Sequence, residues 1–378
     1  MRKLASIQKV IGIRPIEGAD KIEVCQVLGW ECVCKRGEFK VGDLVVYVET
    51  DSILPEKPEF EFLRERHFRI KTIKLRKQIS QGIVFPLDIL PPSTIVFPSN
   101  GNTGSTLEGM DVTEALGVTK HDPQVQEEKD LAEQCHSKSK INKFFMHFAP
   151  YRFVYFKLNH KDKGWPSWIA HTDEERIQAC ARMLTSRPGS EWYVTEKVDG
   201  QSATFFLGTK RSWGIKKLEF GVCSRKVRLG KPDSSSYWSM AKKYKIEDKL
   251  RDLEEPGFVI QGEDCGPKIQ DNKYGLAEQD LFVFNVIDNG TKYTLGQMQT
   301  FCMMNELKTV PVVMATWIFE DKCRTTQEII KELVAMSVGK SVLNKDIWRE
   351  GLVFRLKSDP NVSFKVINPE FSLKYPNN

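Results

Sequence analysis

Short runs in which apolar and polar residues alternate, separated by glycine, proline and aspartate, constrain the fold of this chain more than any other feature. Successive side chains of a β-strand point to opposite faces of a sheet, so such runs predict strands with one buried face. Between residues 5 and 90 they include Ile22–Val27 and Leu44–Glu49, and Gly42-Asp43 marks a turn before the second. Several short strands with closely spaced turns predict a small β-barrel or sandwich.

A polar segment divides these strands from a second set. Residues 91–109 are rich in Pro, Ser, Gly, Asn and Thr, and residues 119–145 are polar and charged, as is typical of loops and linkers. After this segment, strand-like runs alternate with helical patterns and predict an α+β body with antiparallel sheets. We therefore expect a barrel domain over residues 1–118, a linker over 119–145 and a second domain over 146–378.

The composition restricts the class of protein. No apolar run approaches the ~18 residues of a membrane span, and the N-terminus lacks the apolar core of a signal peptide. We therefore expect a monomeric intracellular protein, cytoplasmic or nuclear, with no membrane partner. The formal net charge of +6 permits a phosphate-rich partner without requiring one. Nine cysteines without a Cys-x-x-Cys pair favour free thiols over a zinc site.

A third strand-like run of the first domain, Phe68–Arg76, carries basic side chains. Lys74 and Arg76 should point to one face, and Ile73 and Leu75 to the other. Such a basic row is either a solvated strand face or the surface with which a small barrel binds nucleic-acid phosphates. The sequence leaves both interpretations open.

In the second domain, Thr172–Glu175 predicts a helix start. A threonine followed three residues later by a glutamate is a capping box, in which each side chain satisfies a free backbone N–H. Ile177, Cys180 and Leu184 then recur at helical spacing. We therefore expect the helix to begin directly after Thr172.

A lysine stands at the end of the next predicted strand, Trp192–Lys197. Thr195 and Lys197 share one face of this strand, and the tight-turn dipeptide Asp199-Gly200 follows it. Lys197 should therefore lie at a strand end and point into the space that the sheet encloses. A surface lysine before a hairpin would give the same pattern, so this motif is weak by itself.

Later predicted strands carry further charged and aromatic residues at their ends or within them. In chain order these are Ser224-Arg225, Glu263, Phe282 to Phe284, Glu350-Gly351 and Lys365. Each of them could be a solvated charge or a core aromatic, but their order and types together favour a common site. With Lys197, the set resembles the ordered motifs of the covalent nucleotidyltransferases, which are ATP-dependent ligases and mRNA-capping guanylyltransferases.

A more specific resemblance is to the Deinococcus-type and Naegleria-type RNA ligases. The residues that carry it are Trp165-Pro166, Thr172–Ile177, Glu196–Thr204, Gly266–Leu276 and Ser363–Asn368. That family places an oligonucleotide-binding (OB) module before the nucleotidyltransferase domain, and Gly18–Val24 and Gly37–Val48 are similar to that module. The resemblance implies an OB-type β-barrel followed by an antiparallel-sheet adenylation domain, and it covers nearly the whole chain outside residues 91–145.

The resemblance also implies the reaction. The chain would be an ATP-dependent RNA ligase that seals 3′-OH and 5′-phosphate ends of RNA, or of a nicked duplex, with ATP as the AMP donor. Lys197 would become adenylylated, and Lys365 would neutralise phosphates during the transfer. Some related ligases have a second lysine two residues later, where this chain has Ile367, and Lys374 is a candidate replacement.

The remaining site residues follow from the same resemblance. The expected nucleotide-binding residues are Glu196, Lys197, Gly200, Arg225, Glu263, Phe282, Phe284 and Lys365. The expected ligands of Mg²⁺ or Mn²⁺, directly or through waters, are Asp199, Glu263 and Glu350. One of the two phenylalanines should stack on adenine, and Glu263 could contact the ribose instead of the metal. A nearby cation and burial would lower the pKa of Lys197, which must lose its proton before it attacks.

Two alternatives remain at this point. One is a GTP-dependent mRNA-capping guanylyltransferase, although only 13 residues follow Lys365, too few for the C-terminal barrel of capping enzymes and many DNA ligases. The other is a non-catalytic OB-fold nucleic-acid-binding protein whose lysine motif is accidental. Covalent labelling by ATP, by GTP or by neither would distinguish these alternatives from a ligase.

Overall fold

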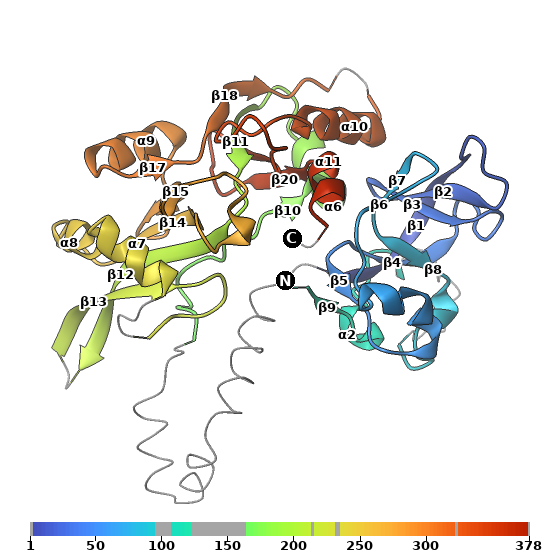
Figure 1. The fold of residues 1–378 in the computed structure, drawn as a ribbon, viewed down its shortest axis with the longest axis horizontal. Coiled ribbons are helices and arrows are strands. Elements are labelled where there is room, and N and C mark those ends of the chain that lie inside the picture. The colour runs from blue at the N-terminus through green and yellow to red at the C-terminus, as the bar shows by residue number, and fades with distance from the viewer. Residues whose placement is uncertain are drawn as a thin grey trace, which may run out of the picture.

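The computed structural model describes residues 3–94, 107–121, 164–212, 215–230, 235–321 and 324–376. These residues form an N-terminal domain, blue to cyan in Figure 1, and a C-terminal domain built on two sheets. Residues 122–163, which contain most of the expected linker and the start of the expected second domain, lie outside the described ranges. No helix within those ranges is long and apolar enough to cross a membrane.

The N-terminal domain is an OB-fold with a nearly closed antiparallel barrel. Its sheet has the order β3-β2-β1-β4-β8. The strands are β1 (Ala5–Pro15), β2 (Ile22–Val27), β3 (Trp30–Lys35), β4 (Leu44–Val48) and β8 (Ile83–Phe85). The two ends of this sheet approach each other, because the backbone N–H of Gln81 donates to the carbonyl of Glu31 at 2.9 Å. The predicted small barrel is thus confirmed.

Two short antiparallel strand pairs extend the barrel. β5 (Ser52–Ile53) pairs with β9 (Thr119–Lys120), and β6 (Ile73–Leu75) pairs with β7 (Gln78–Ser80). The η1 helix (Pro58–Arg66), η2 (Leu87–Ile89) and α2 (Thr113–Leu116) cover the barrel end. β9 lies just beyond residue 118 and pairs with β5 of the N-terminal domain.

The first sheet of the C-terminal domain has the order β10-β20-β19-β11-β18. Its strands are β10 (Glu175–Arg176), β20 (Ser363–Ile367), β19 (Gly351–Leu356), β11 (Glu191–Lys197) and β18 (Val312–Ile318). The α6 helix (Ile177–Thr185) and α10 (Thr326–Ser337) cover one face, where Ile177 and Leu333 join a core with Trp192, Phe354 and Phe364. This core fixes the strand that ends at Lys197.

The second sheet has six strands, and three helices cover its outer face. The strands are β12 (Gln201–Ser212), β13 (Ile215–Cys223), β14 (Phe258–Cys265), β15 (Asp280–Asp288), β16 (Thr291–Lys292) and β17 (Lys308–Thr309). The helices are α7 (Ser236–Lys243), α8 (Ile246–Arg251) and α9 (Leu295–Met304). Trp238, Ile246 and Met298 of these helices pack against Phe205 and Ile260 of the sheet. The other face packs partly against Trp165 and Ile169, and elsewhere it lines a cavity through Glu263 and Phe284.

The structure corrects two predictions. The long strands pair antiparallel as predicted, but β10 with β20 and β15 with β17 are short parallel pairs, so both sheets are mixed. The capping box is wrong, because α6 begins at Ile177 and its N-cap, Arg176, makes no side-chain cap. Thr172 instead shares a hydrogen bond with the Ser202 hydroxyl, at 2.9 Å.

The two domains touch through the turn between β2 and β3. The N–H of Gly29 donates to the carbonyl of Gln178 in α6 at 3.2 Å, and Gln327 of α10 donates to the carbonyl of Leu28. A Cβ atom added to Gly29 would lie 2.4 Å from Ile330 and 2.9 Å from the Cα of Gln178. Only glycine therefore permits this approach of the barrel to the second domain.

Candidate active site

A cavity lies between the two sheets of the C-terminal domain and is closed on one side by the N-terminal domain. Its polar lining from the C-terminal domain includes Asp173, Lys197, Asp199, Glu263, Glu350 and Lys365. The N-terminal domain contributes Thr50, Asp51, Arg69, Lys71 and Lys120. The sequence motifs that lie far apart in the chain therefore meet in one place.

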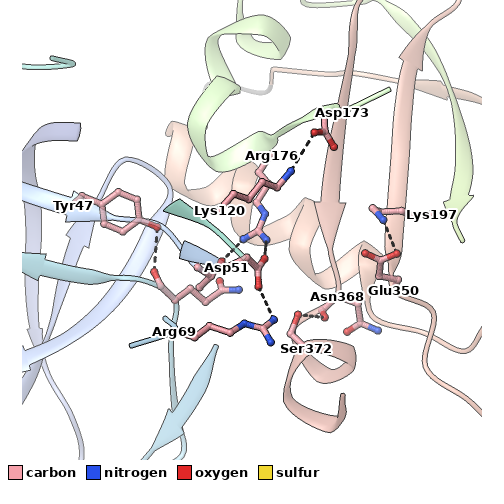
Figure 2. Close-up of polar contacts among 12 residues, drawn as sticks. Tyr47, Asp51, Arg69, Lys120, Asp173, Arg176, Lys197, Glu350, Asn368 and Ser372 are labelled. Atoms are coloured by element: carbon pink, nitrogen blue, oxygen red, sulfur yellow. Dashed lines mark hydrogen bonds and ion pairs between the residues drawn. The ribbon is translucent and has the colours of Figure 1, made fainter. Parts of the chain in front are cut away.

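Lys197 and Glu350 form the centre of this site. Lys197 ends β11 directly opposite Gly351, the first residue of β19, and Glu350 precedes that glycine. The Nζ of Lys197 lies 2.6 Å from Oε2 of Glu350, as Figure 2 shows. The antiparallel register of two neighbouring strands thus brings together side chains that are 153 residues apart.

The charges around Lys197 keep it protonated. Burial lowers its pKa, but the carboxylates of Glu350, Glu263 and Asp199 raise it by more, so the pKa lies above the ordinary value of a lysine. A ligand that neutralised these carboxyl groups would lower the pKa of the amine again. The expected lowering of this pKa therefore requires a bound cation, because the groups of the protein itself raise it.

Glu263, whose carboxyl group also lies near Lys197, is harder to ionise than an ordinary glutamate. Burial raises its pKa to about 8, with Glu350 and Asp199 adding to the rise and Lys197 opposing it. Burial also raises the pKa of Glu350, and Lys197 lowers it only in part. Three carboxyl groups thus lie around the ammonium groups of Lys197 and Lys273, the second of which pairs with Asp199, and this leaves room for further positive charge.

This surplus of carboxyl groups fits a hydrated divalent cation. In the described ranges, no three His, Cys, Asp or Glu side chains lie close enough together to hold a metal ion directly. The expected set of Asp199, Glu263 and Glu350 is therefore suited to contacts through waters, which Mg²⁺ tends to keep.

Asp199 is held in place by the segment 266–276. The ammonium of Lys273 lies 2.9 Å from its carboxylate, and the N–H of Asp199 donates to the hydroxyl of Tyr274 at 2.7 Å. Both side chains of the Lys273–Asp199 pair are almost fully buried, at 5% and 10% exposed. Sequence reasoning missed Lys273 and Tyr274 as site residues, although the resemblance included the segment that carries them.

Gly200 is needed for close packing. Its φ is not positive, so a left-handed turn is not the reason for glycine here. A Cβ atom at this position would lie 2.5 Å from the carbonyl oxygen of Asp264 and 3.0 Å from the Glu263 side chain. The glycine lets β12 start directly against the part of β14 that carries Glu263.

The two phenylalanines of β15 share a face, as predicted, but differ in position. Phe282 is buried in a cluster with Val198 and Tyr274, and Phe284 packs at the edge of that cluster. Only Phe284 is among the residues that line the cavity. The structure therefore leaves Phe284, and not Phe282, able to stack on a base.

Asp173 organises several cations around the cavity. It accepts hydrogen bonds from Arg225 and, at 3.2 Å, from Lys120 of the N-terminal domain. Burial alone would raise its pKa, but Arg225, Lys120 and Lys365 lower it well below the usual range. The expected phosphate ligand Arg225 thus binds Asp173, and Lys365 lies near enough to lower the pKa of the same carboxyl group.

The residues after Asp173 tie the segment to both domains. Glu174 accepts a hydrogen bond from the buried Arg355 at 2.7 Å. Arg176 donates to Asp51 at 2.6 Å and to the hydroxyl of Thr50, and Arg69 approaches Asp51 at 3.4 Å (Figure 2). The capping-box interpretation of the segment 172–175 concealed these roles.

Of the three remaining predicted site residues, two line the cavity and one does not. Lys365 lines the cavity from β20, opposite Arg176 of β10. Glu196 also lines it, but one of its carboxylate oxygens accepts the N–H of Val342 at 2.7 Å, and burial raises its pKa. Lys374, at the end of α11 (Pro369–Lys374), is not among the lining residues, and its ammonium lies 5.4 Å from the ring centre of Tyr375. The structure therefore does not bring Lys374 to the site.

Comparisons with known proteins agree with this geometry. A family model described as RNA ligase matches residues 190–367, and an OB-fold domain model matches residues 4–87. The structure of Naegleria gruberi RNA ligase with pyrophosphate is 30% identical, with a TM-score of 0.76 and 100% of both chains covered. Variants of that enzyme with AMP and manganese, and with ATP and manganese, are each 30% identical, with TM-scores of 0.75 over 100% of both chains. A comparison with curated proteins gave no match.

Proposed function

This chain belongs to the RNA ligase family, and we propose from that premise that it joins a 3′-OH end of RNA to a 5′-phosphate end through an AMP carried on Lys197. The observation that supports this most directly is the position of Lys197. Its amine lies at a strand end inside a cavity, 2.6 Å from Glu350, with Glu263 and Asp199 close enough to raise its pKa. This is the arrangement of a nucleophile that a cationic ligand activates.

The nucleotide would be ATP, as in the Naegleria gruberi structures that contain ATP or AMP. Phe284 would stack on the adenine. Arg225 would release Asp173 and, together with Lys365, bind phosphates instead. A divalent cation held through waters by Asp199, Glu263 and Glu350 would neutralise these carboxylates and the phosphate charge. The pKa of Lys197 would then fall, because the charges that raise it would be neutralised.

The chemistry is a sequence of three transfers. The neutral amine of Lys197 attacks the α-phosphorus of ATP, a phosphorus–nitrogen bond forms, and the bond to pyrophosphate breaks. The 5′-phosphate of RNA then attacks the same phosphorus, which frees Lys197 and leaves AMP on the RNA end. Finally the 3′-OH attacks that end, forms the phosphodiester and releases AMP. The protein's contribution is positioning and charge neutralisation, which dominate phosphoryl-type transfers.

Covalent labelling tests this proposal. The wild-type chain should acquire label from α-labelled ATP, and Lys197→Ala should acquire none, because no other amine occupies its place. Lys357→Ala is a matched control, since Lys357 is paired with Glu191 outside the cavity. Label retained by Lys197→Ala would refute the proposal.

The nucleotide and the product are tested separately. GTP in place of ATP should give no adduct, whereas a capping guanylyltransferase would prefer GTP. The labelled protein, given a nicked RNA duplex with a 5′-phosphate, should lose its label and yield a sealed strand. A protein that binds RNA but forms no adduct with either nucleotide would be a non-catalytic binding protein.

A further inference from the structure

The positive charge of this chain is concentrated in one segment of the N-terminal domain. Between residues 64 and 77 there are seven basic residues and one glutamate, so this segment alone carries a charge of +6, equal to the formal net charge of the whole chain. The seven are Arg64, Arg66, Arg69, Lys71, Lys74, Arg76 and Lys77. The rest of the chain is neutral on balance, so the segment marks where a polyanion would be attracted.

This segment leads from the cavity to the outer surface. Arg69, Lys71 and Thr72 line the cavity, and β6 and its turn continue from there with Lys74, Arg76 and Lys77, all three exposed. None of these three makes an ion pair with an acidic residue in the described ranges. Burial lowers the pKa of Lys71, and the charges of Arg69 and Arg66 add to this effect.

The two residues of the turn at the outer end are of types that its backbone conformation disfavours. Leu75 pairs with Gln78, so Arg76 and Lys77 form a two-residue hairpin loop, and their φ angles are 48° and 66°. Two positive φ angles in such a loop are those of a type I′ turn, which favours Asn-Gly and disfavours long side chains. Residues kept in a disfavoured conformation frequently serve a function.

The base of the hairpin is firmly attached to the barrel. Gln78 donates to Glu31 and accepts from Arg14, each at 2.7 Å, and Arg14 also donates to Glu31 at 2.8 Å. The Ser80 hydroxyl accepts the N–H of Val33 at 2.9 Å. The two cationic residues at the turn are therefore held in a defined place by β3 and β1.

We propose that the β6–β7 hairpin, with Lys74, Arg76 and Lys77, binds the phosphate backbone of the RNA substrate next to the break. The proposal rests on the proposed ligase function and names the surface that would hold its substrate. The segment from Lys71 to Arg76, which includes β6 (Ile73–Leu75), would span up to about 17 Å if fully extended at ~3.3 Å per residue. That length spans several phosphates of a nucleic-acid strand at ~3.4 Å of rise each. Lys74, Arg76 and Lys77 lie outside the residues that line the cavity, so an extended polyanion fits them better than a nucleotide bound within it.

The double variant Arg76→Asn/Lys77→Gly separates charge from folding. It removes two positive charges but supplies the residues that the turn favours, so the unfolding temperature should be no lower than that of the wild type. Binding to a nicked RNA duplex, measured by fluorescence anisotropy without ATP, should weaken roughly tenfold at 0.15 M salt. The slope of log affinity against log salt should become shallower by about 1.4 to 1.8, or 0.7 to 0.9 per phosphate contact.

The matched control is Lys242→Gln/Lys245→Gly. These two exposed lysines lie at α7 and α8, on the outer face of the six-stranded sheet, and Lys245 also has a positive φ, 49°. Figure 1 shows these helices on the opposite side of the molecule from β6 and β7. This variant loses the same charge but should keep the affinity and salt slope of the wild type.

Three outcomes would overturn the proposal. RNA affinity and salt slope could be unchanged in Arg76→Asn/Lys77→Gly, or the control could weaken binding equally. Alternatively, formation of the lysine–AMP adduct could fall while RNA binding stays the same, which would assign the hairpin to ATP. Because binding is measured without ATP, absence of adduct in the wild type would refute the ligase proposal and leave this test intact.

Discussion

Replacing Glu263 by glutamine should make the protein more stable at high pH while stopping its chemistry. In the folded chain, burial raises the pKa of Glu263 from 4.5 to about 8. Between these values the unfolded chain releases a proton that the folded chain retains, so stability falls as the pH rises. At 1.36 kcal/mol per pH unit, the loss is about 1 kcal/mol by pH 5.5 and about 5 kcal/mol by pH 9. Glutamine is neutral at every pH and avoids this loss.

The assay is urea unfolding of wild type and Glu263→Gln in metal-free buffer, followed by the fluorescence of tryptophans such as the buried Trp192. The advantage of the variant should grow by roughly 3–4 kcal/mol between pH 5.5 and pH 9. Manganese added at pH 9 should stabilise the wild type more than the variant, because the ionised carboxyl attracts the cation. A stability difference that does not change with pH would refute the reasoning.

Two further substitutions test how the site is held together. Lys273→Ala should slow adduct formation on Lys197 roughly 10- to 100-fold by releasing the Asp199 carboxylate, with Lys273→Arg restoring most of the rate; equal rates in labelling time courses would contradict this. Gly200→Ala should lower the free energy of unfolding by about 1–3 kcal/mol, because its Cβ would lie 2.5 Å from a backbone oxygen. Unchanged urea unfolding of Gly200→Ala would show that β12 can shift at no cost.

The sequence predicted those parts of the site that local patterns determine. The strand that ends at Lys197 and the strands that carry Glu263 and Lys365 follow from alternation, and the structure has all three. That Phe282 and Phe284 share a face also follows from the period of two. Which of them reaches the cavity depends on what packs against β15, and residue spacing contains no information about that.

The contributions of distant residues could not be predicted. Asp51 and Arg176 are 125 residues apart and meet only because the barrel docks on the second domain. The segment Thr172–Glu175 matches a capping box locally, but Glu175 belongs to β10, which pairs with β20, and the Thr172 hydroxyl bonds to Ser202 instead. Both capping residues therefore have partners that lie far away in the sequence. The tertiary interactions of this segment therefore override its local capping pattern.

The contact between Lys197 and Glu350 also bears on how this protein survives between reactions. A free amine in an accessible cavity would be open to acylation, carbamylation and imine formation with aldehydes, each of which would block it. An ammonium clamped 2.6 Å from a carboxylate has no lone pair to offer these reagents. If Lys197 is the nucleophile that we propose, its reactivity would return only when nucleotide and cation arrive together, and the pair with Glu350 would protect the amine between reactions.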